Sequence, residues 1–262
     1  MEVRLLPLVD VHCHLLAGLD DGPKTDEEAL AMCRMAFADG TRFVCATAHQ
    51  NEKWHTVTPE RILSATERLV SQLRQRNIPL TVVPCAEVMV EPEMLDGWQD
   101  GNYLSLANHK KYILIEMPHG LFVNLCHIVR NFTEQGIRPI LAHPERTPEL
   151  LSEPRYMEEL LDAGCLMQVS ARSITAPDAT NVDVRQVKKW LKRGWIHLLG
   201  SDGHSPRHRT PLLAEAYHRI TRWIGSVEAD RICSGNGLAV IQGLPIQAPV
   251  HKPVASWFSR LW

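Results

Sequence analysis

Short apolar runs alternate along the chain with longer segments in which apolar residues recur at helical spacing. The first run predicts a strand, and a helix follows it. Thr25 and Glu28 form a capping box, apolar residues then recur every three to four positions, and Gly40 ends the pattern. A looser stretch follows the third strand. Seven strands are predicted, at residues 8–12, 42–47, 80–86, 112–115, 139–142, 165–169 and 196–200. Helices with their caps are predicted at residues 25–40, 58–73, 122–135, 156–163, 182–193 and 212–233.

Strands that alternate with crossover helices predict an α/β fold, with a parallel sheet and helices outside it. No change of composition and no linker divides the chain, so we expect a single domain. Seven strand–helix units favour closure of the sheet into a barrel. The pattern alone also fits an open sheet.

Polar residues of metal-ligand type stand where the predicted strands end. In a parallel α/β barrel these carboxyl ends meet at one rim, where active sites are found. The residues are His, Asp or Glu and none is Cys, which favours a hydrolytic site for Zn, Mn or Fe over a structural zinc site. The candidate ligands are His12, His14, Asp21, His49, Glu87, Glu116, His143, Asp202 and His204.

Each motif taken alone also fits a structural role. His12 and His14 lie one residue apart and therefore face the same side of a strand, but such a pair is weak evidence for a metal. Glu87 also fits a helix N-cap, and the segments around His143 and Asp202 also fit simple turns. The position that all these residues share, at strand ends, favours the metal site.

The composition is that of a soluble globular protein: of the 262 residues, 45% are hydrophobic and 22% are charged. The net charge of -2 argues against a nucleic-acid partner, which would require a basic excess.

The N-terminus does not resemble a signal peptide, and no run approaches the roughly 20 apolar residues of a membrane span. The seven cysteines are scattered without a Cys-x-x-Cys motif, which predicts reduced thiols and a cytoplasmic location. None belongs to a Cys-x5-Arg phosphate loop, so thiol chemistry is not expected.

The strand-end motifs, taken in order, resemble the PHP (polymerase and histidinol phosphatase) superfamily. The Asp-Asp-Gly-Pro-Lys run and the His-x-Glu-Arg element resemble specifically its bacterial protein-tyrosine phosphatase branch, whose members accompany capsular and exopolysaccharide loci. The resemblance runs from residue 8 to about residue 245. Its motifs lie at residues 12–14, 20–24, 47–49, 86–87, 115–116, 142–146 and 201–204.

This resemblance implies the fold, the cofactors and the partner. The fold would be a distorted (β/α)7 barrel of the PHP type at residues 1–245, followed by a C-terminal tail at residues 246–262. The cofactors would be three divalent metal ions, with Mn²⁺ favoured and Fe or Zn as alternatives. The substrate would be a phosphotyrosine protein, a cognate membrane-associated tyrosine autokinase that controls capsular or exopolysaccharide biosynthesis.

The resemblance also implies a role for each site residue. Arg146 and Arg209 would bind the phosphate and act in catalysis, with Arg207 as an alternative to Arg209; a structural ion pair is the other role that fits them. Glu116 and Asp21 stand where many superfamily members have histidine, and the added oxygen ligands favour Mn²⁺ over Zn²⁺. The three implied ligand sets are His12, His14, Glu87 and Asp202; Glu87, Glu116 and His143; and Asp21, His49 and His204.

Two segments depart from this pattern or extend beyond it. Residues 50–54, where the branch often carries basic residues, hold one acid and one base. In the tail, Trp257, Phe258, Leu261 and Trp262 would share one helical face. This face fits contact with a membrane surface or a partner, and it also fits packing against the barrel, which we favour.

Two other functions compete with the tyrosine phosphatase. One is a small-molecule phosphomonoesterase of histidinol-phosphatase type, which the Asp-Asp-Gly-Pro-Lys run and the lack of a large insertion disfavour. The other is a non-catalytic metal-binding regulator, which the complete set of candidate ligands disfavours.

Overall fold

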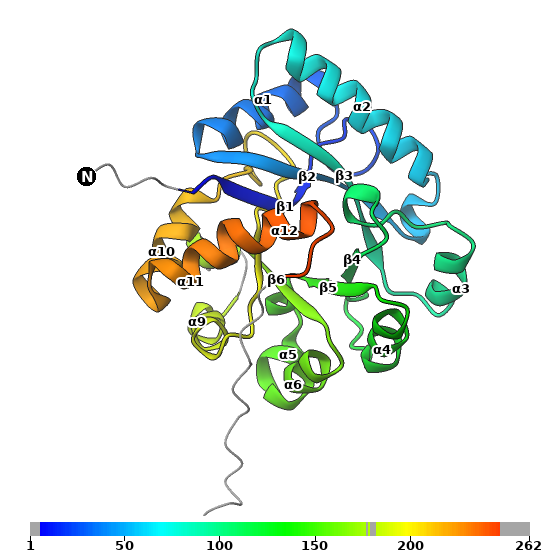
Figure 1. Cartoon of the computed structure of the whole chain (residues 1–262), viewed down its shortest axis with the longest axis vertical. Coiled ribbons are helices and arrows are strands. Elements are labelled where there is room, and N and C mark those ends of the chain that lie inside the picture. Colours follow the sequence, from blue (N-terminus) through cyan, green and yellow to red (C-terminus); the bar gives the residue numbers. More distant parts are fainter. Residues whose placement is uncertain (1–5, 177, 179–181, 247–262) are drawn as a thin grey trace, which may run out of the picture.

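The computed structural model describes residues 6–176, 178 and 182–246. Its centre is a sheet of seven parallel strands in which each strand pairs with the next one along the chain. Helices surround the strands, as Figure 1 shows. The strands are β1 (Leu8–His14), β2 (Thr41–Gln50), β3 (Thr81–Met89), β4 (Tyr112–Glu116), β5 (Arg138–Ala142), β6 (Leu166–Ser170) and β7 (Leu198–Gly200).

Two of the helices begin at the caps that the sequence predicts. The Thr25 hydroxyl accepts from the N–H of Glu28, and the Thr58 hydroxyl accepts from the N–H of Arg61. The helices are α1 (Asp26–Ala38), α2 (Pro59–Gln75), α3 (Met94–Gln99), α4 (Cys126–Glu134), α5 (Pro148–Ser152), α6 (Pro154–Asp162), α7 (Ala171–Thr175), α9 (Val184–Arg193), α10 (Ala214–Ile224), α11 (Ser226–Asp230) and α12 (Asn236–Ile241). Shorter turns are the 3-10 helices η1 (Glu52–Trp54), η2 (Leu106–Asn108) and η3 (Pro144–Arg146) and the π-helix η4 (Arg231–Gly235).

The first and last strands of the sheet meet and close it. The backbone N–H of His14 donates to the carbonyl of Gly203 over 2.8 Å, and the N–H of Asp202 donates to the carbonyl of His12 over 2.7 Å. Both bonds join β1 to the segment directly after β7. The predicted single-domain (β/α)7 barrel is therefore confirmed, and its closing bonds lie at the end where the candidate ligands gather.

A bulge in β1 changes which side chains face the barrel interior. The pairing register with β2 shifts by one residue in the middle of the strand. Up to Val11 the strand faces inward with apolar residues: Val9 and Val11 belong to the apolar cluster that fills the barrel, together with residues such as Leu114. From His12 onward, His12 and His14 bring their Nε2 atoms to 3.2 Å from each other. One strand thus supplies both the apolar filling and the start of the site.

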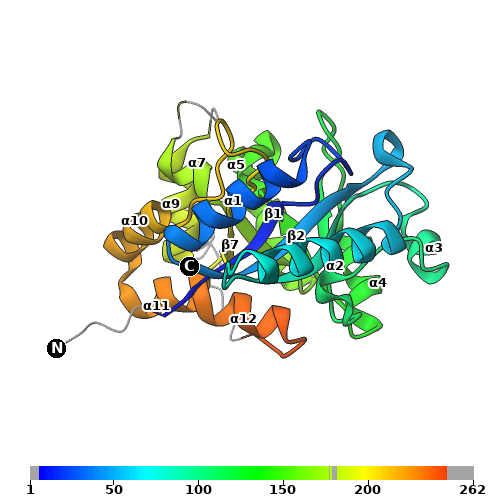
Figure 2. The same ribbon diagram turned by 90° about the horizontal axis from the view of Figure 1, so that it is seen from above.

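The amino end of the barrel is closed by α12. A Cβ atom on Gly237 of this helix would lie only 2.7 Å from Val9 Cγ1, so a glycine is required for the helix to approach β1 this closely. Figure 2 shows α11 and α12 on the side of the barrel opposite the loop that follows β1. The polar rim at the other end is consequently the place where a ligand can reach the interior.

Three strands extend two or three residues further than the sequence predicts. β1, β2 and β3 continue to His14, Gln50 and Met89, so that His49 and Glu87 lie inside strands instead of after them. Pairing explains the extension, because the β2–β3 ladder continues to the last residue of β2. The ligand positions are held by sheet hydrogen bonds as a result.

Two predicted helices also differ. The helix expected from residue 122 begins at Cys126, where the Asn124 side chain accepts from its N–H over 2.9 Å. The helix expected over residues 212–233 is interrupted at Gly225, whose φ of +89° no continuous helix allows.

None of the helices in the described part of the chain has the length and apolar composition needed to span a lipid bilayer. The predicted tail contact through Trp257, Phe258, Leu261 and Trp262 lies outside the described residues.

Candidate metal centre

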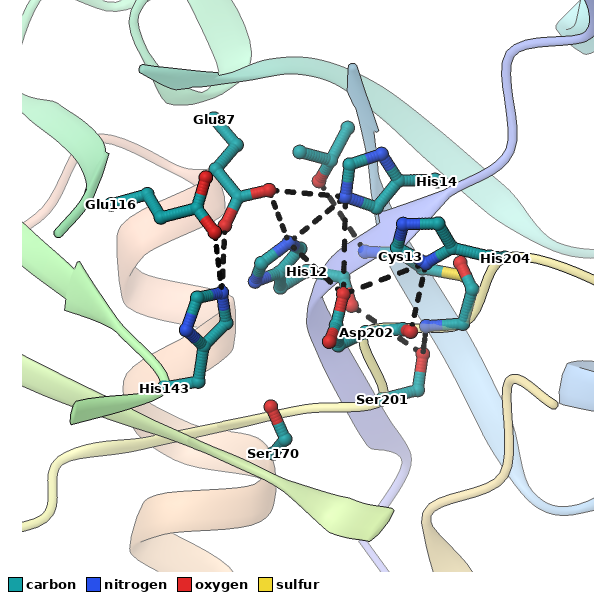
Figure 3. Close-up of polar contacts among 12 residues, drawn as sticks. His12, Cys13, His14, Glu87, Glu116, His143, Ser170, Ser201, Asp202 and His204 are labelled. Atoms are coloured by element: carbon teal, nitrogen blue, oxygen red, sulfur yellow. Dashed lines mark hydrogen bonds and ion pairs between the residues drawn. The ribbon is translucent and has the colours of Figure 1, made fainter. Parts of the chain in front are cut away.

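The structure brings all nine candidate ligands to the carboxyl-end rim of the barrel. Figure 3 shows most of them turned toward one another. His12 and His14 lie on β1, His49 on β2, Glu87 on β3 and Glu116 at the end of β4; His143 follows β5, Asp202 and His204 follow β7, and Asp21 lies in the loop after β1.

A compact group of ligand atoms surrounds Glu87. The Nε2 atoms of His12 and His14 lie 3.2 Å apart, and each lies 3.2 Å from Glu87 Oε2. Asp202 Oδ1 stands 3.6 Å from His12 Nε2. All four side chains are buried, so water does not screen these atoms from one another.

Hydrogen bonds on the far side of each imidazole fix its orientation. His12 Nδ1 lies 2.9 Å from Gln168 Oε1, and His14 Nδ1 lies 2.7 Å from Asp20 Oδ2. Burial alone would raise the pKa of Asp20, but the charge and the hydrogen bond of His14 lower it to about 2. Because Gln168 and Asp20 offer oxygen acceptors, Nδ1 carries the proton in each neutral ring and Nε2 presents a lone pair toward Glu87. A metal-ligating histidine characteristically has such a second hydrogen bond.

Sequence analysis missed Asp20 and Gln168 as orienting residues. Gln168 has a signal, because it is the one polar side chain in the central part of the apolar strand β6. Asp20 has a weaker signal, because it precedes Asp21 and loop sequence does not indicate which of the two carboxylates turns inward. The structure separates their positions: the side chain of Asp20 is 1% exposed and that of Asp21 is 43% exposed.

A second group lies between β3, β4 and β5. His143 Nε2 lies 2.9 Å from Glu87 Oε1 and 3.5 Å from Glu116 Oε1. His49 Nδ1 approaches the same carboxylates, at 3.2 Å from Glu87 Oε2 and 3.7 Å from Glu116 Oε2. In Figure 3, Glu116 and His143 lie on the side of the cluster away from His204. Glu87 thus contacts both groups, with Oε2 toward His12, His14 and His49 and Oε1 toward His143.

The third group is open to solvent. Asp21 Oδ1 lies 3.3 Å from His204 Nε2 and 3.5 Å from His49 Nε2, and His14 borders the same space. Burial would raise the pKa of Asp21, but the close approach of the His204 and His49 imidazoles holds it well below its usual range. The carboxylate is therefore ionised and available as a ligand.

The buried carboxylates exceed the positive charge near them. Burial raises the pKa of Glu116 to about 9, and the charges of Glu87 and Asp202 act in the same direction. Burial also lowers the pKa of His143 to about 4, with a further contribution from Arg146. A neutral imidazole and a protonated carboxyl are what these groups become when no other cation is present. Bound cations would let Glu116 ionise.

Two site residues hold the left-handed backbone conformation, which favours glycine. His143 has a φ of 33° and Asp202 a φ of 53°. Each follows the end of a strand and turns its side chain back into the barrel mouth. Such strain persists only where surrounding contacts hold it, and it concentrates at functional sites.

Two arginines stand at the edge of the groups and converge on one carboxylate. Arg146 and Arg209 both donate to Asp202 Oδ2, the latter over 2.5 Å. Burial would raise the pKa of Asp202, but the neighbouring cations, Arg146 first, hold it well below its usual range. The two side chains are 32% and 33% exposed, so each guanidinium also reaches the open mouth. Arg207 is exposed, whereas Arg209 reaches Asp202, so Arg209 is the arginine of this loop that lies in the site.

The residues fit divalent metal ions. Three buried ligand atoms, His49 Nδ1, Glu116 Oε2 and His204 Nε2, have no hydrogen-bond partner within the described part of the chain. Leaving a buried polar atom unpaired costs about 1–3 kcal/mol. A set of nitrogen and carboxylate donors without sulfur suits Mn²⁺, Fe²⁺ or Zn²⁺. Metal ions placed among these atoms would satisfy them.

The fold and the site together define the class of protein: a (β/α)7 barrel of the PHP type with candidate metal-binding groups at its carboxyl-end rim. A family model described as capsular polysaccharide synthesis, CpsB/CapC, matches residues 8–242. The chain belongs to this CpsB/CapC family.

Several proteins with assigned functions are similar over nearly the whole chain. Tyrosine-protein phosphatase YwqE of Bacillus subtilis is 30% identical over 231 residues, which cover 84% of this chain and 86% of that protein. Tyrosine-protein phosphatase CpsB of Streptococcus agalactiae is 28% identical over 241 residues, covering 90% and 98%. These matches confirm the resemblance to the phosphatase branch of the superfamily.

Solved structures agree with this placement. A chain from the crystal structures of YwqE from Bacillus subtilis and CpsB from Streptococcus pneumoniae, described as unique metal-dependent tyrosine phosphatases, matches with a TM-score of 0.87 and 26% identity. The match covers 94% of this chain and 99% of that chain. Dihydropyrimidinase from Brevibacillus agri, at 11% identity and a TM-score of 0.54, shares the fold alone.

Proposed function

We propose that the protein is a metal-dependent protein-tyrosine phosphatase. The observation that carries the proposal is a group of buried His, Asp and Glu side chains whose lone pairs face one another beside two partly exposed arginines. The relatives named tyrosine-protein phosphatases support the substrate.

The ligands divide into three sets, each for one divalent ion. Mn²⁺ is favoured over Fe and Zn, because carboxylate oxygens contribute to every set. The distances given above support the division, and they add His14 to the surroundings of the solvent-exposed ion. The sets are His12, His14, Glu87 and Asp202; Glu87, Glu116 and His143; and Asp21, His49 and His204.

The side chains of this chain supply binding and orientation. Divalent ions, when bound, acidify water and offset the negative charge of a phosphoryl group. Gln168 and Asp20 hold the imidazoles of His12 and His14 so that their lone pairs point inward. Arg146 and Arg209 present N–H groups suited to phosphoryl oxygens. A tyrosine leaving group has a pKa of about 10, so it departs without a strong general acid.

The substrate is a phosphotyrosine protein, and we assign it to a membrane-associated tyrosine autokinase that controls capsular or exopolysaccharide biosynthesis. The family description, capsular polysaccharide synthesis, supports this process. A cytoplasmic location is supported by the seven cysteines, all of them free and buried. In this proposal residues 1–245 form the catalytic domain, and residues 246–262 form a tail that contacts a membrane or partner or packs on the barrel.

One set of assays tests the function against its alternatives. Purified protein is incubated with Mn²⁺ and a phosphotyrosine peptide, a phosphoserine peptide or histidinol phosphate, with and without a chelator. We expect turnover of the phosphotyrosine peptide that the chelator abolishes.

Each alternative has its own outcome in these assays. Turnover of histidinol phosphate without turnover of phosphotyrosine would support a small-molecule phosphomonoesterase. Metal binding without turnover of any substrate would support a regulator. Activity that resists the chelator would refute the metal-dependent mechanism.

A further inference from the structure

The structure contains a cleft directly beside Glu116 and His143, on the side of the site away from His204. We infer that this cleft is the subsite for the aromatic ring of the substrate and that Leu121 determines the preference for aryl phosphates. The inference rests on the proposed function and deepens it.

The cleft has the size that a phenyl ring requires. Its volume is about 200 Å³. An engineered apolar cavity of about 150 Å³ in another protein is sufficient to bind benzene. The cleft therefore has enough room for one ring.

The lining of the cleft includes the phosphate-binding part of the site. Glu116, His143 and Arg146 all line the cleft, and the first two are buried. A phosphoryl group held there places its ester oxygen toward the cleft, and the ring attached to that oxygen extends between the walls. The ring and the phosphoryl group are thus accommodated in one continuous depression.

The cleft has apolar side chains on which a ring can pack. Met117, Pro118, Leu121 and Pro148 line it, together with the polar His119, Thr147 and Glu149. Aromatic rings gain free energy from contact with apolar side chains, roughly in proportion to the area removed from water. An alkyl phosphate such as phosphoserine has no ring to fill this space, so the same walls contribute nothing to its binding.

Leu121 is an exposed member of this lining, and the chain around it is held in place. Its side chain is 62% exposed. The N–H of Leu121 donates to the carbonyl of Pro118 over 3.3 Å, which closes the turn. The next residue, Phe122, packs its ring 4.7 Å from the ring of Tyr156. A single exposed leucine is unremarkable in itself, but this one is fixed at the rim of a cleft that opens on the ligands.

The test compares Leu121→Ser with Leu244→Ser. Leu244 is 52% exposed and follows α12 at the amino end of the barrel, so the control makes the same chemical change far from the cleft. Steady-state rates on a phosphotyrosine peptide give kcat and KM, and inorganic phosphate serves as an inhibitor that fills the phosphate position without a ring. Thermal unfolding checks that both variants fold.

We expect Leu121→Ser to raise KM for the phosphotyrosine peptide about tenfold, the lower range for a hydrophobic pocket contact. The inhibition constant of inorganic phosphate and kcat should stay unchanged. Leu121→Met, which keeps an apolar side chain at this position, should have the KM of the wild type. Leu244→Ser should change none of these values.

The outcomes separate this inference from the proposed function. An active wild type whose KM is unchanged by Leu121→Ser overturns the ring subsite alone. An equal increase in KM and in the inhibition constant of phosphate also overturns it, because Leu121 would then affect binding of the phosphate group and not of the ring. A wild type without phosphotyrosine turnover overturns both.

Discussion

The site has an inner end and an outer end, and they differ in exposure. At the inner end the side chains of Glu87, Glu116 and His143 are 1%, 5% and 8% exposed. At the outer end Asp21 is 43% exposed, although its neighbours His49 and His204 are buried. Ligands of the same chemical type therefore work in two different environments.

At the inner end the charge of a carboxylate must be compensated by a cation or by the protein, whereas at the outer end water can compensate it. A buried carboxylate that loses its cation stays in a medium that solvates it poorly, and the pKa of Glu116, raised to about 9 by burial first, reflects this. The exposed Asp21 is solvated whether or not a cation is present. Substitutions at the inner end should accordingly have larger effects than substitutions at the outer end.

The largest effect is expected for Glu116→Gln. The amide keeps the shape of the side chain but cannot carry the negative charge that a cation at the inner end requires. We expect a loss of about 10³-fold in kcat, since a bound metal contributes several kcal/mol to the transition state. Excess Mn²⁺ should not restore the rate. Rates measured over roughly 0.1 to 10 times the saturating Mn²⁺ concentration test this.

The matched control is Glu93→Gln, on an exposed position in the loop after β3. Its rate should equal that of the wild type. If excess Mn²⁺ restored the full rate of Glu116→Gln, a cation at the inner end would not require the negative charge of Glu116.

A smaller effect is expected for Arg146→Ala at the edge of the inner end. Arg146 donates to Asp202 and borders the cleft, so its removal takes away one phosphate donor and one cation beside a buried carboxylate. We expect kcat to fall about 10²-fold, as for the loss of one preorganised donor. Inhibition by inorganic phosphate should weaken as well.

Arg155→Ala serves as the control, because Arg155 is 66% exposed on α6. An Arg146→Ala variant with normal phosphate inhibition would show that the arginine is a structural ion pair and does not bind phosphate.

The fold and the candidate ligands could be predicted because they depend on local pattern. Apolar runs, caps and glycine stops mark each strand and helix, and a parallel barrel brings strand ends to one rim. Glu87 and Asp202, far apart in sequence, could therefore be placed together without knowing any distance. The structure places both beside His12, at 3.2 Å and 3.6 Å.

Contacts between distant segments could not be predicted in this way. The bulge in β1 depends on pairing with β2, and the bond between Gln168 and His12 joins residues 156 positions apart. The meeting of Arg146 and Arg209 on Asp202 depends on how two loops turn after β5 and β7. Alternation in one strand carries no information about such partners.

A still smaller effect is expected for Asp20→Asn. Asp20 is not a proposed metal ligand but holds the ligands in their orientation. The carboxylate accepts from His14 Nδ1 and from the N–H groups of His49 and Gly22, so it orients ligands of both ends. The amide is a weaker acceptor, and we expect the affinity for Mn²⁺ to fall about 10- to 100-fold. Metal titration by calorimetry measures this without reference to turnover. Asp100→Asn, at an exposed position after α3, is the control, and equal affinities in both variants would refute the orienting role.

The smallest effect is expected for Asp21→Asn, at the outer end itself. The side chain is partly solvated, and an exposed ion contact contributes up to about 1 kcal/mol, which corresponds to about fivefold in affinity. The amide oxygen remains a ligand, so excess Mn²⁺ should restore the wild-type rate, in contrast to Glu116→Gln. Rates measured against metal concentration in both variants compare the two ends directly. A contrary result would be a loss of activity in Asp21→Asn as large as that in Glu116→Gln, with no recovery in excess Mn²⁺. The two ends would then not differ because of their exposure, and the ion at the outer end would be required as strictly as those at the inner end.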